Sequence, residues 1–345
     1  MSYCVISRDA EPPPDWQPFA RRHGSFYHDA HWITALRDAF GYRLTFLTAR
    51  VDGAAQGILP LALVPGLVGP RRLVSLPFSY AAGPAAVSPT VDQELVEAAR
   101  AHAAEQGVTR LEIKRRGTAP PPEHGAQRVM HYVTYRLEPG PDPWSRLDAS
   151  STRRGIKRAQ QLNVQAVPGA GAADWEAMGR LQERTSRAHG VPAPPRRFFT
   201  DTCQRLQRMG LADLRLARLA DGRIAAGVVI WRGAGEWIYA FGASDPRTLE
   251  YRPNHLLLWT ILQEAAREGV VFDLGRAAPE QEGLTEFKRR WGGQPIPLAY
   301  DYWPKASGLN VRPRDRGLLA AAARLWSLLP APVARLGSGL YRYLG

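Results

Sequence analysis

The sequence predicts a protein of mixed α/β (α+β) class with two similar domains. Each domain is expected to hold a mixed, twisted sheet flanked by helices. A chain of 345 residues suits two domains of roughly 100 to 200 residues each. The same order of elements, a hairpin, a helix and a strand, occurs once in each half. A proline-rich joint at residues 139–143 separates the two copies.

The repeated hairpin is the first of these observations. Residues 47–59 and 216–229 each contain two apolar runs around an Asp-Gly pair, which begins at Asp52 in one copy and at Asp221 in the other. Asp-Gly between two such runs is a strong sequence signal for a hairpin. Both segments are therefore predicted to be antiparallel strand pairs.

The second repeated piece is a helix followed by a short strand. Residues 103–115 and 265–276 each run from a helical pattern through a glycine into a strand that carries an acid and a nearby base. Glycine just after a helix is a common stop signal. In the second copy we expect a helix over 254–268, a strand over 270–274 and a closing strand over 296–302.

The joint sets the expected domain boundaries. Residues 139–143 read Pro-Gly-Pro-Asp-Pro, which continues neither a helix nor a central strand. We therefore expect an N-terminal domain over 1–146, a C-terminal domain over 147–305 and a basic amphipathic helical tail over 306–345.

Charge and cysteine content limit the classes of function. The net charge of +13 suits a polyanionic partner such as RNA or an anionic membrane surface. Only four of the 45 basic residues are lysine, however, and so strong an arginine bias is equally typical of a GC-rich genome. Cys4 and Cys203 lie far apart, without the spacing of a disulfide framework or a zinc site. The N-terminus lacks the pattern of an export signal, so a cytoplasmic location is expected.

A basic helix is expected after the joint. Residues 150–152 offer capping side chains, and residues 153–159 read Arg-Arg-Gly-Ile-Lys-Arg-Ala. Cations at a helix start oppose the helix dipole. Arg153, Arg154 and Lys157 are thus candidate anion contacts, although simple solvation is the commoner explanation for such charges.

Several segments together resemble the FemAB-like family of acyltransferases. In the second half they are residues 153–159, 253–257, Phe-Asp-Leu-Gly-Arg at 272–276 and Phe-Lys-Arg-Arg-Trp-Gly at 287–292. The first half matches through 26–28, 57–61 and 73–78, and the tail from 329 to 345 is similar to the subgroup associated with exosortase and exopolysaccharide loci.

The resemblance implies two tandem GNAT-like domains that share a cleft. It also implies transfer of an acyl or aminoacyl group onto an amine, since peptidoglycan-bridge members move an amino acid from aminoacyl-tRNA to a cell-wall precursor. Such a transfer is already downhill, so an enzyme mainly positions the reactants and stabilises the developing oxyanion.

The choice of donor depends on one loop. A coenzyme A site ordinarily cradles the pyrophosphate with backbone amides of a glycine-rich loop at a helix start. Here the corresponding segment, 251–255, has no glycine and contains Pro253, which has no amide hydrogen. Aminoacyl-tRNA is therefore the favoured donor and acyl-CoA the alternative, with no further cofactor. An envelope precursor, an exopolysaccharide amino sugar and a small metabolite all remain open as acceptors.

The candidate catalytic residues are Lys288 and Asp273. Lys288 follows Phe287 in the segment that matches the family's functional Phe-Lys pair, and its ammonium suits a developing oxyanion. Asp273 and Arg276 end a strand where this fold opens its cleft, so they are candidates to orient the amine. The structural alternatives are a solvated basic helix face for Lys288 and an ion pair that fixes the loop for Asp273.

The other candidate substrate contacts come from several segments. Arg187 lies in a segment that resembles the family's substrate-phosphate region, so it is a candidate to bind a diphosphate or carboxylate. An exposed arginine that binds no ligand is an equal alternative. Packing in the core competes with a binding role for each aromatic residue. No metal site is expected, because His28 and His31 have no third ligand. The remaining candidates are Trp32, Tyr80, Tyr239, Asn254, His255 and Trp291.

Two further hypotheses remain. A non-catalytic module that binds RNA or an anionic glycolipid through its basic surface is the rival function. In the tail, arginines recur among apolar residues at near-helical spacing, so the tail is a candidate for peripheral contact with the inner membrane face; packing against the second domain explains the same pattern. The residues concerned are Arg316, Leu318, Leu319, Arg324, Leu325, Trp326, Leu328, Leu329, Arg335 and Arg342.

Overall fold

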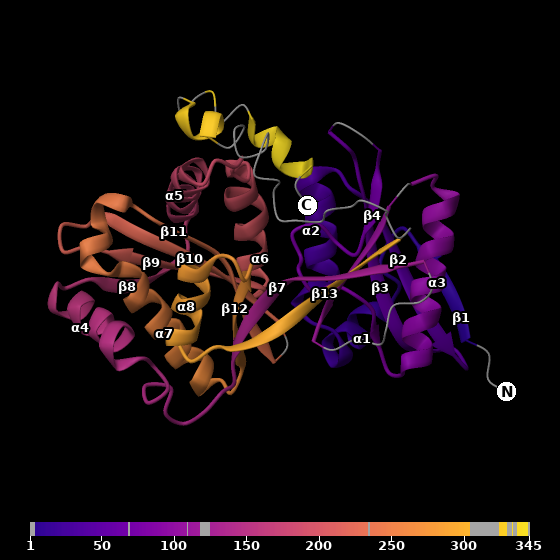
Figure 1. Ribbon diagram of the computed structural model, residues 1–345, viewed down its shortest axis with the longest axis horizontal. Helices are drawn as coiled ribbons and strands as arrows, with labels where there is room; N and C mark the ends of the chain where they lie inside the picture. Colours follow the sequence, from indigo (N-terminus) through magenta and orange to yellow (C-terminus); the bar gives the residue numbers. More distant parts are fainter. Residues whose placement is uncertain are drawn as a thin grey trace. The chain divides into compact units, whose positions relative to one another are not determined.

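The computed structural model divides the chain into two compact units (Figure 1). The first unit comprises 1–133, 296–313 and 342–345, and the second comprises 134–295 and 314–341. The structure describes residues 4–67, 70–108, 110–117, 125–233, 235–303, 324–329, 333 and 337–343. The main boundary thus lies at residue 134, inside a strand, and not near residue 146 as the proline-rich joint suggested.

The first unit is a mixed sheet with helices packed on it. Its strands follow the order β1-β2-β3-β4-β6-β13, with β5 beside β3. The pairs β1–β2, β2–β3, β3–β4 and β6–β13 are antiparallel, whereas β4 and β6 are parallel. The elements are β1 (Cys4–Asp9), α1 (Trp16–His23), η1 (Phe26–His28), α2 (Ala30–Phe40), β2 (Arg43–Val51), β3 (Ala54–Val64), β4 (Arg72–Val74), β5 (Ala85–Ala86), α3 (Pro89–Glu105), β6 (Leu111–Arg116), β7 (Gln127–Leu137) and β13 (Gln294–Trp303). The strands β7 and β13 both cross the division, so each has residues in both units.

The second unit repeats this plan. Its strands follow the order β7-β12-β11-β10-β9-β8, and Figure 1 shows α5 and α7 on opposite sides of the strands β9–β11. Leu214, Val228, Ile261 and Phe272 belong to its buried core. The elements are η2 (Ala149–Arg153), α4 (Arg154–Gln161), β8 (Gln165–Gly169), α5 (Ala172–Ala188), η3 (Phe198–Cys203), α6 (Gln204–Arg208), β9 (Ala212–Arg218), β10 (Ile224–Arg232), β11 (Glu236–Ser244), η4 (Pro246–Tyr251), α7 (Pro253–Arg267), β12 (Val271–Ala277) and α8 (Glu282–Arg290).

Both predicted repeats are present. The hairpins are β2–β3 and β9–β10, each antiparallel, and their turns hold Gly53 and Gly222 at φ values of 80° and 82°. Only glycine adopts this conformation without steric cost. The helices α3 and α7 are followed by Gly107 and Gly269, also at positive φ, and each leads into a strand, β6 or β12. The α/β fold expected from the repeat is confirmed.

The strands β11 and β12 position the candidate site. They pair in parallel from Glu236 with Val271 to Ile238 with Asp273, where their pairing ends within the described residues. Beyond that point β11 continues beside β10 as far as Ser244. The carboxyl ends of two parallel strands therefore separate at Asp273, the place at which such sheets bind ligands.

The cap of the basic helix differs from the expectation. The side chain of Asp148, and not one of residues 150–152, accepts a hydrogen bond from Ser151 N at 2.7 Å. The hydroxyl groups of Ser150 and Ser151 also bond to Asp148 Oδ1, and these bonds hold the Asp148 pKa down at about 2. The serines thus stabilise the capping carboxylate instead of capping the helix themselves.

The tail is described only in part. Of the residues that suggested a membrane contact, Arg316, Leu318, Leu319 and Arg335 lie outside the described residues. A helical turn is present over 324–328, and η5 follows at Gly337–Tyr343. Of the helices that the structure describes, none combines the length and the hydropathy needed to cross a bilayer.

Candidate functional site

Lys288 lies at the point where β11 and β12 separate. It is on α8 and only 5% exposed, and its Nζ donates to the carbonyl oxygens of Gly275 at 2.5 Å and Arg276 at 3.0 Å. The Tyr135 ring lies 5.8 Å from this nitrogen. An ammonium carries three donor hydrogens, so two fix its position and a third is left for another acceptor.

Burial has a clear electrostatic effect on Lys288. It lowers the pKa of the ammonium from 10.5 to about 8, with Asp273 opposing the shift and Arg276 adding to it. The charged form still predominates at neutral pH, in a low-dielectric environment where its attraction for an oxyanion is strong. The alternative of a solvated Lys288 on an exposed helix face is wrong.

Asp273 is fully buried on β12. It accepts hydrogen bonds from the Thr134 hydroxyl and from Gly275 N, the latter at 2.8 Å. Gly275 has a φ of 79°, and a Cβ there would lie 2.9 Å from the Tyr239 carbonyl oxygen. Asp273 thus holds the turn whose carbonyls anchor Lys288, while Arg276 is exposed.

Replacing Asp273 with alanine is expected to destabilise the second unit. The change leaves the Thr134 hydroxyl and the Gly275 amide without this acceptor, at about 1 to 3 kcal/mol for each buried group. We expect the free energy of unfolding to fall by about 2 to 4 kcal/mol in urea denaturation. Asp201→Ala, at an exposed position, is the matched control. Equal stability of the two variants would show that Asp273 does not hold the turn.

An aromatic cluster adjoins Lys288. Phe287 lies 6.1 Å from both the His255 and the Trp291 rings, so the i to i+4 packing of Phe287 and Trp291 is confirmed. Trp291 is 1% exposed, yet its Nε1 has no hydrogen-bond partner among the described residues. Burial lowers the His255 pKa to about 4, with a smaller contribution from Arg252, so this imidazole is neutral at neutral pH.

His255 is also part of a basic pocket of about 690 Å³. None of the described residues that line it is acidic. Gly155 lets α4 approach α7, since a Cβ at this position would lie 2.4 Å from His255 Cδ2. The lining residues are Trp144, Ala149, Ser151, Arg153, Arg154, Gly155, Lys157, Arg158, Gln161, Arg252 and His255.

The cations of this pocket differ in how they are held. Arg153 donates to the Ser145 carbonyl at 2.7 Å and lies 5.8 Å from the Trp144 ring, whereas its Nε has no partner within the described residues. Arg154, Lys157 and Arg158 are exposed, and no ion pair is present for them in the part of the chain that the structure describes. Three predicted anion contacts, Arg153, Arg154 and Lys157, are thus brought together with His255.

The loop before α7 offers few backbone donors to this pocket. Arg252 has the left-handed conformation, with a φ of 55°, and Pro253 follows it as the first residue of the helix. The amide of His255 already bonds to the Arg252 carbonyl at 3.0 Å, and the Asn254 side chain donates to Ser244 Oγ at 2.7 Å. Positive charge at this helix start therefore comes mainly from side chains.

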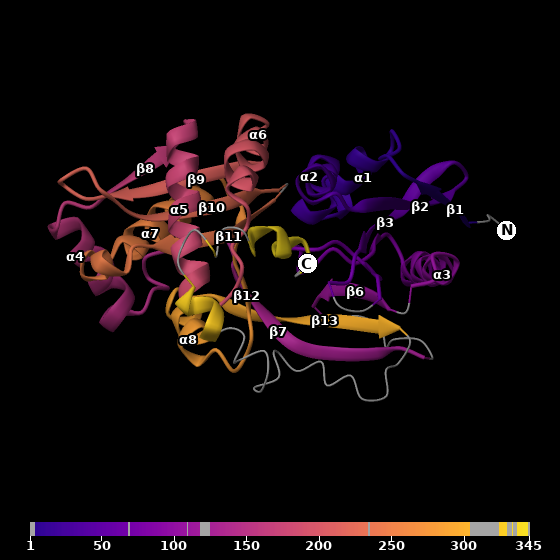
Figure 2. The same ribbon diagram turned by 90° about the horizontal axis from the view of Figure 1, so that it is seen from above.

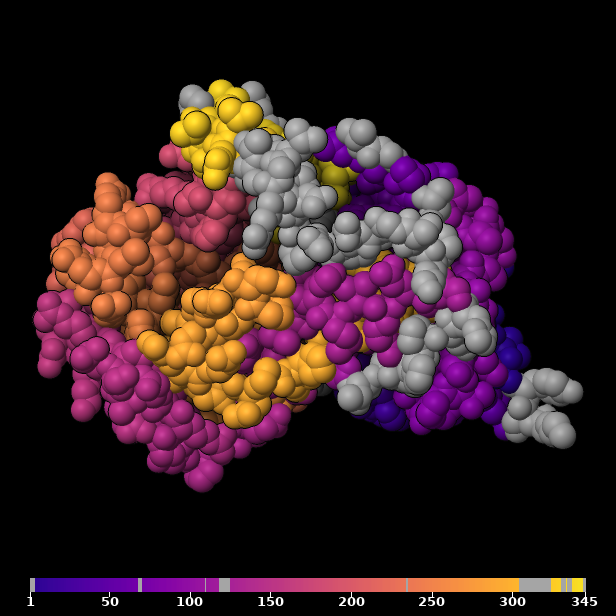
Figure 3. All heavy atoms as spheres, in the orientation of Figure 1, coloured from indigo at the N-terminus to yellow at the C-terminus, as the bar shows by residue number. Residues whose placement is uncertain are grey.

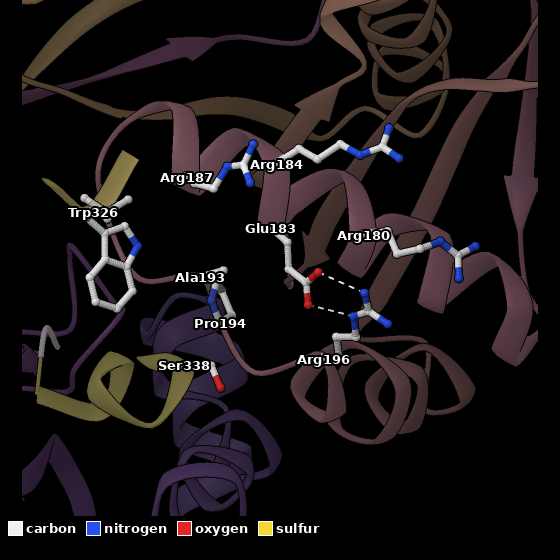
Figure 4. Close-up of a pocket in the computed structure, with 10 residues that line it drawn as sticks. Arg180, Glu183, Arg184, Arg187, Ala193, Pro194, Arg196, Trp326 and Ser338 are labelled. Atoms are coloured by element: carbon white, nitrogen blue, oxygen red, sulfur yellow. Dashed lines mark hydrogen bonds and ion pairs between the residues drawn. The ribbon is translucent and has the colours of Figure 1, made fainter. Parts of the chain in front are cut away.

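Arg187 lines a separate pocket of about 480 Å³ on α5 (Figure 4). Its neighbours Arg180, Arg184 and Arg196 form ion pairs with Glu176, Asp245 and Glu183, but no acidic partner of Arg187 occurs among the described residues. Val191, Ala193, Pro194 and Trp326 form apolar walls.

The remaining candidate aromatics are mostly core residues. In the first unit Trp32 is 1% exposed and donates to Ser79 Oγ at 3.0 Å, and Tyr80 packs edge-on against Tyr27. In the second unit burial raises the Tyr239 pKa to about 12. Its hydroxyl occupies the space that a Cβ would take at Gly242.

The histidines of the H-x-x-H pattern serve local structure. His28 bonds to the Gly83 carbonyl at 2.7 Å and to Ser25, and His31 pairs with Asp29 at 3.0 Å. Across the described ranges no three His, Cys, Asp or Glu side chains are grouped as metal ligands would be.

Several residues near the site were not predicted from the sequence. Thr134 and Tyr135 come from β7, on the first-domain side of the expected boundary. Trp144 directly follows the proline-rich joint. Arg252 could have been found from its place before Pro253, because an arginine at a helix start without capping side chains is a recognisable anion signal.

Comparison with known proteins identifies the fold. Residues 148–289 match the acetyltransferase (GNAT) domain family, whereas no curated protein matches the chain in sequence. The structure is similar to FemX, with a TM-score of 0.65 and 14% identity, over 86% of this chain and 96% of that one. For L-PGS from Bacillus licheniformis the TM-score is 0.56 and the identity 16%, over 92% and 98% of the two chains. A tandem GNAT protein from the clavulanic acid biosynthesis pathway gives 0.51 and 14%, over 88% and 100%.

Proposed function

We propose that the chain is an acyltransferase of the FemAB-like type, which moves an acyl or aminoacyl group from a phosphate-rich donor to an amine. The observation that carries this proposal is the position of Lys288. Its buried ammonium lies where β11 and β12 separate. The residue before it on α8, Phe287, contacts His255, which lines the basic pocket. A GNAT-type acyltransferase fold supplies the scaffold.

In the proposed mechanism the donor's phosphates bind in the basic pocket and its carbonyl lies near Lys288. The free N–H of the ammonium donates to the carbonyl oxygen as the amine attacks and negative charge develops there. The new C–N bond forms, the C–O bond of the ester breaks, and the proton that the amine loses passes to the departing oxygen, so that the donor leaves with a free hydroxyl group. The two carbonyls that hold Lys288 make it preorganised, so little reorganisation is needed during the reaction.

The favoured donor is aminoacyl-tRNA. Side chains and not backbone amides supply the positive charge of the basic pocket, and clustered Arg and Lys side chains suit the repeated phosphates of a nucleic acid. Trp144, next to Arg153, offers a ring on which a terminal base can stack. Acyl-CoA is the alternative, because the pocket adjoins the start of α7, where a GNAT domain ordinarily binds its thioester.

The donor is tested by offering labelled aminoacyl-tRNA and labelled acyl-CoA separately. Each is mixed with the protein and a panel of amines that includes an amino sugar and an envelope extract. We expect protein-dependent transfer of label from aminoacyl-tRNA, and Arg289→Ala, exposed beside Lys288, should act like the wild type. Turnover with the thioester alone would show that acyl-CoA, and not aminoacyl-tRNA, is the donor.

A binding module without catalytic activity is the second candidate function. The basic pocket favours it, because none of its described lining residues is acidic. This function predicts that RNA or an anionic glycolipid binds and that Lys288→Ala leaves the cellular phenotype unchanged in a folded protein. Loss of function in that variant, with RNA binding retained, supports catalysis instead.

Peripheral attachment to a membrane is part of the proposal for the tail. Leu325 and Leu328 are 67% and 79% exposed on one helical turn, and one turn of exposed leucines next to arginines suits a lipid interface. Flotation of the full-length protein with anionic liposomes, compared with Leu325→Ser and Leu328→Ser, tests the attachment. Equal flotation of the full-length protein and the two variants would show that these leucines do not attach the protein to a membrane.

A further inference from the structure

His255 lies between two helices at the edge of the basic pocket. It belongs to the first turn of α7, and its ring packs against α4, because a Cβ at Gly155 would lie 2.4 Å from His255 Cδ2 and 2.8 Å from His255 Nε2. Figure 2 shows α4 beside α7, and the two helices are in contact. In Figure 3 the magenta atoms around α4 lie at the surface. The imidazole is therefore half-buried next to an exposed helix and lines the pocket.

The charged side chains that line the pocket with this imidazole are all cations within the described residues. The neighbouring helix α8 presents only the uncharged rings of Phe287 and Trp291, at 6.1 and 6.2 Å. Asp148, before η2, is not part of the lining, and its carboxylate is bonded to Ser150 and Ser151. The cations come from η2, α4 and the residue before α7. They are Arg153, Arg154, Lys157, Arg158 and Arg252.

This environment keeps the imidazole neutral in the absence of an anion. Neither ring nitrogen of His255 has a hydrogen-bond partner in the part of the chain that the structure describes, whereas His31, for comparison, is paired with Asp29. Burial and the nearby cations both disfavour a second proton on the ring. The lowered pKa of His255, about 4, agrees with this geometry.

A phosphate bound in the pocket changes the balance. Its negative charge offsets the repulsion from the arginines, and its oxygens accept a hydrogen bond from the second N–H group that only the protonated ring carries. An opposite charge within about 4 to 6 Å strengthens the binding of a proton to such a group about 10- to 1000-fold. The proton comes from the solvent and binds to the unprotonated ring nitrogen.

We propose that phosphate binding in the basic pocket is coupled to the uptake of one proton by His255. The five arginine and lysine side chains of the lining attract the anion, and the imidazolium becomes a sixth cation beside it. This inference rests on the proposed function, because it concerns the pocket assigned to the donor's phosphates. It makes the affinity for the donor depend on pH, with tighter binding in more acidic solution.

Calorimetry with trimetaphosphate tests the coupling without any donor or acceptor. This cyclic anion keeps its three charges throughout the pH range used, so it contributes no protons of its own. The full-length protein is titrated at about pH 5.5 in two buffers of different ionisation enthalpy, and the difference in heat gives the protons taken up per anion. We expect an uptake of about 0.2 to 1 proton and about tenfold tighter binding at about pH 5 than at about pH 8.

Variants assign the proton to one residue. His255→Gln keeps a side chain that donates an N–H group but cannot titrate, so it should bind trimetaphosphate without proton uptake and with equal affinity at both pH values. Arg154→Gln should weaken binding at every pH and keep the uptake, which places the anion in this pocket. His189→Gln, exposed directly after α5 and outside the lining, is the matched control and should behave as the wild type does. Equal melting temperatures at each pH check that every variant folds.

The outcomes separate this inference from the proposed function. If trimetaphosphate does not bind, if Arg154→Gln does not weaken its binding, or if His255→Gln shows the proton uptake and pH dependence of the wild type, the coupling is overturned even when transfer from a donor is observed. If the uptake depends on His255 but neither aminoacyl-tRNA nor acyl-CoA supports transfer, the titrating phosphate site stands and the proposed acyl transfer falls.

Discussion

Replacing Lys288 with alanine is expected to slow transfer about 100- to 1000-fold, the usual loss when one preorganised oxyanion donor is removed. The affinity for the donor should change little, because the donor's phosphates bind in the basic pocket and not at Lys288. The loss should appear in kcat under saturating donor, as expected for an interaction made only in the transition state. Arg289→Ala, one residue along α8 and exposed, controls for the loss of a cation near the site.

The pH dependence gives a second measure of the same residue. Burial lowers the Lys288 pKa to about 8, and the mechanism needs the charged form. The rate should therefore fall as the pH rises through about 8, well below the range in which an ordinary lysine titrates. Lys288→Arg, which stays charged, should lose this alkaline limb at whatever activity it retains.

The same pKa shift changes the stability of the fold in the opposite direction to the rate. The folded chain gives up the Lys288 proton at a lower pH than the unfolded chain does, so the unfolded state binds more protons between about pH 8 and 10.5. The contribution of Lys288 to the free energy of unfolding therefore increases as the pH rises across that window, while the activity falls. Parallel losses of activity and stability above pH 8 would point to general unfolding and not to titration of Lys288.

The second large effect is expected in the basic pocket. The double replacement Arg153→Ala and Arg154→Ala removes two cations, each able to make a charge-assisted hydrogen bond worth about 1.5 to 3 kcal/mol. We expect the donor to bind about 100-fold more weakly or worse. Anisotropy with labelled aminoacyl-tRNA measures this directly. Arg197→Ala and Arg208→Ala, exposed in the same unit and outside the pocket lining, make a double control of equal charge.

Salt dependence identifies the nature of this binding. Contacts with phosphates release counterions, so the logarithm of the affinity falls linearly with the logarithm of the salt concentration. Removing two phosphate contacts should make the slope shallower by about 1.5 to 2. An unchanged slope, with weaker affinity, would indicate that the two arginines act by holding the fold around Trp144.

Local patterns predicted the repeated architecture well. The Asp-Gly pairs at Asp52 and Asp221 and the glycines after α3 and α7 depend on short-range backbone preferences, which a sequence shows directly. The packing of Phe287 on Trp291 follows in the same way from i to i+4 spacing on one helix.

The parts that the sequence did not predict depend on long-range contacts. The boundary lies inside β7 because Thr134 and Tyr135 contact Asp273 and Lys288 in the second unit, and nothing in the local sequence of β7 records this pairing. The Asp148 cap was missed because the serines after it are equally good caps. The position of Trp326 against α5 likewise depends on tertiary packing, which the arginine and leucine spacing of the tail does not specify.

The position of Lys288 at the reacting carbonyl is tested by a crystal structure with a non-hydrolysable analogue of whichever donor supports turnover. For aminoacyl-tRNA the analogue is a short 3′ end with an amide in place of the ester. We expect Lys288 Nζ to lie about 2.7 to 3.1 Å from the carbonyl oxygen, with the donor's phosphates beside Arg153 and Arg154. A carbonyl held elsewhere, with Lys288 still bound only to Gly275 and Arg276, would show that this lysine is structural and that the proposed mechanism is wrong.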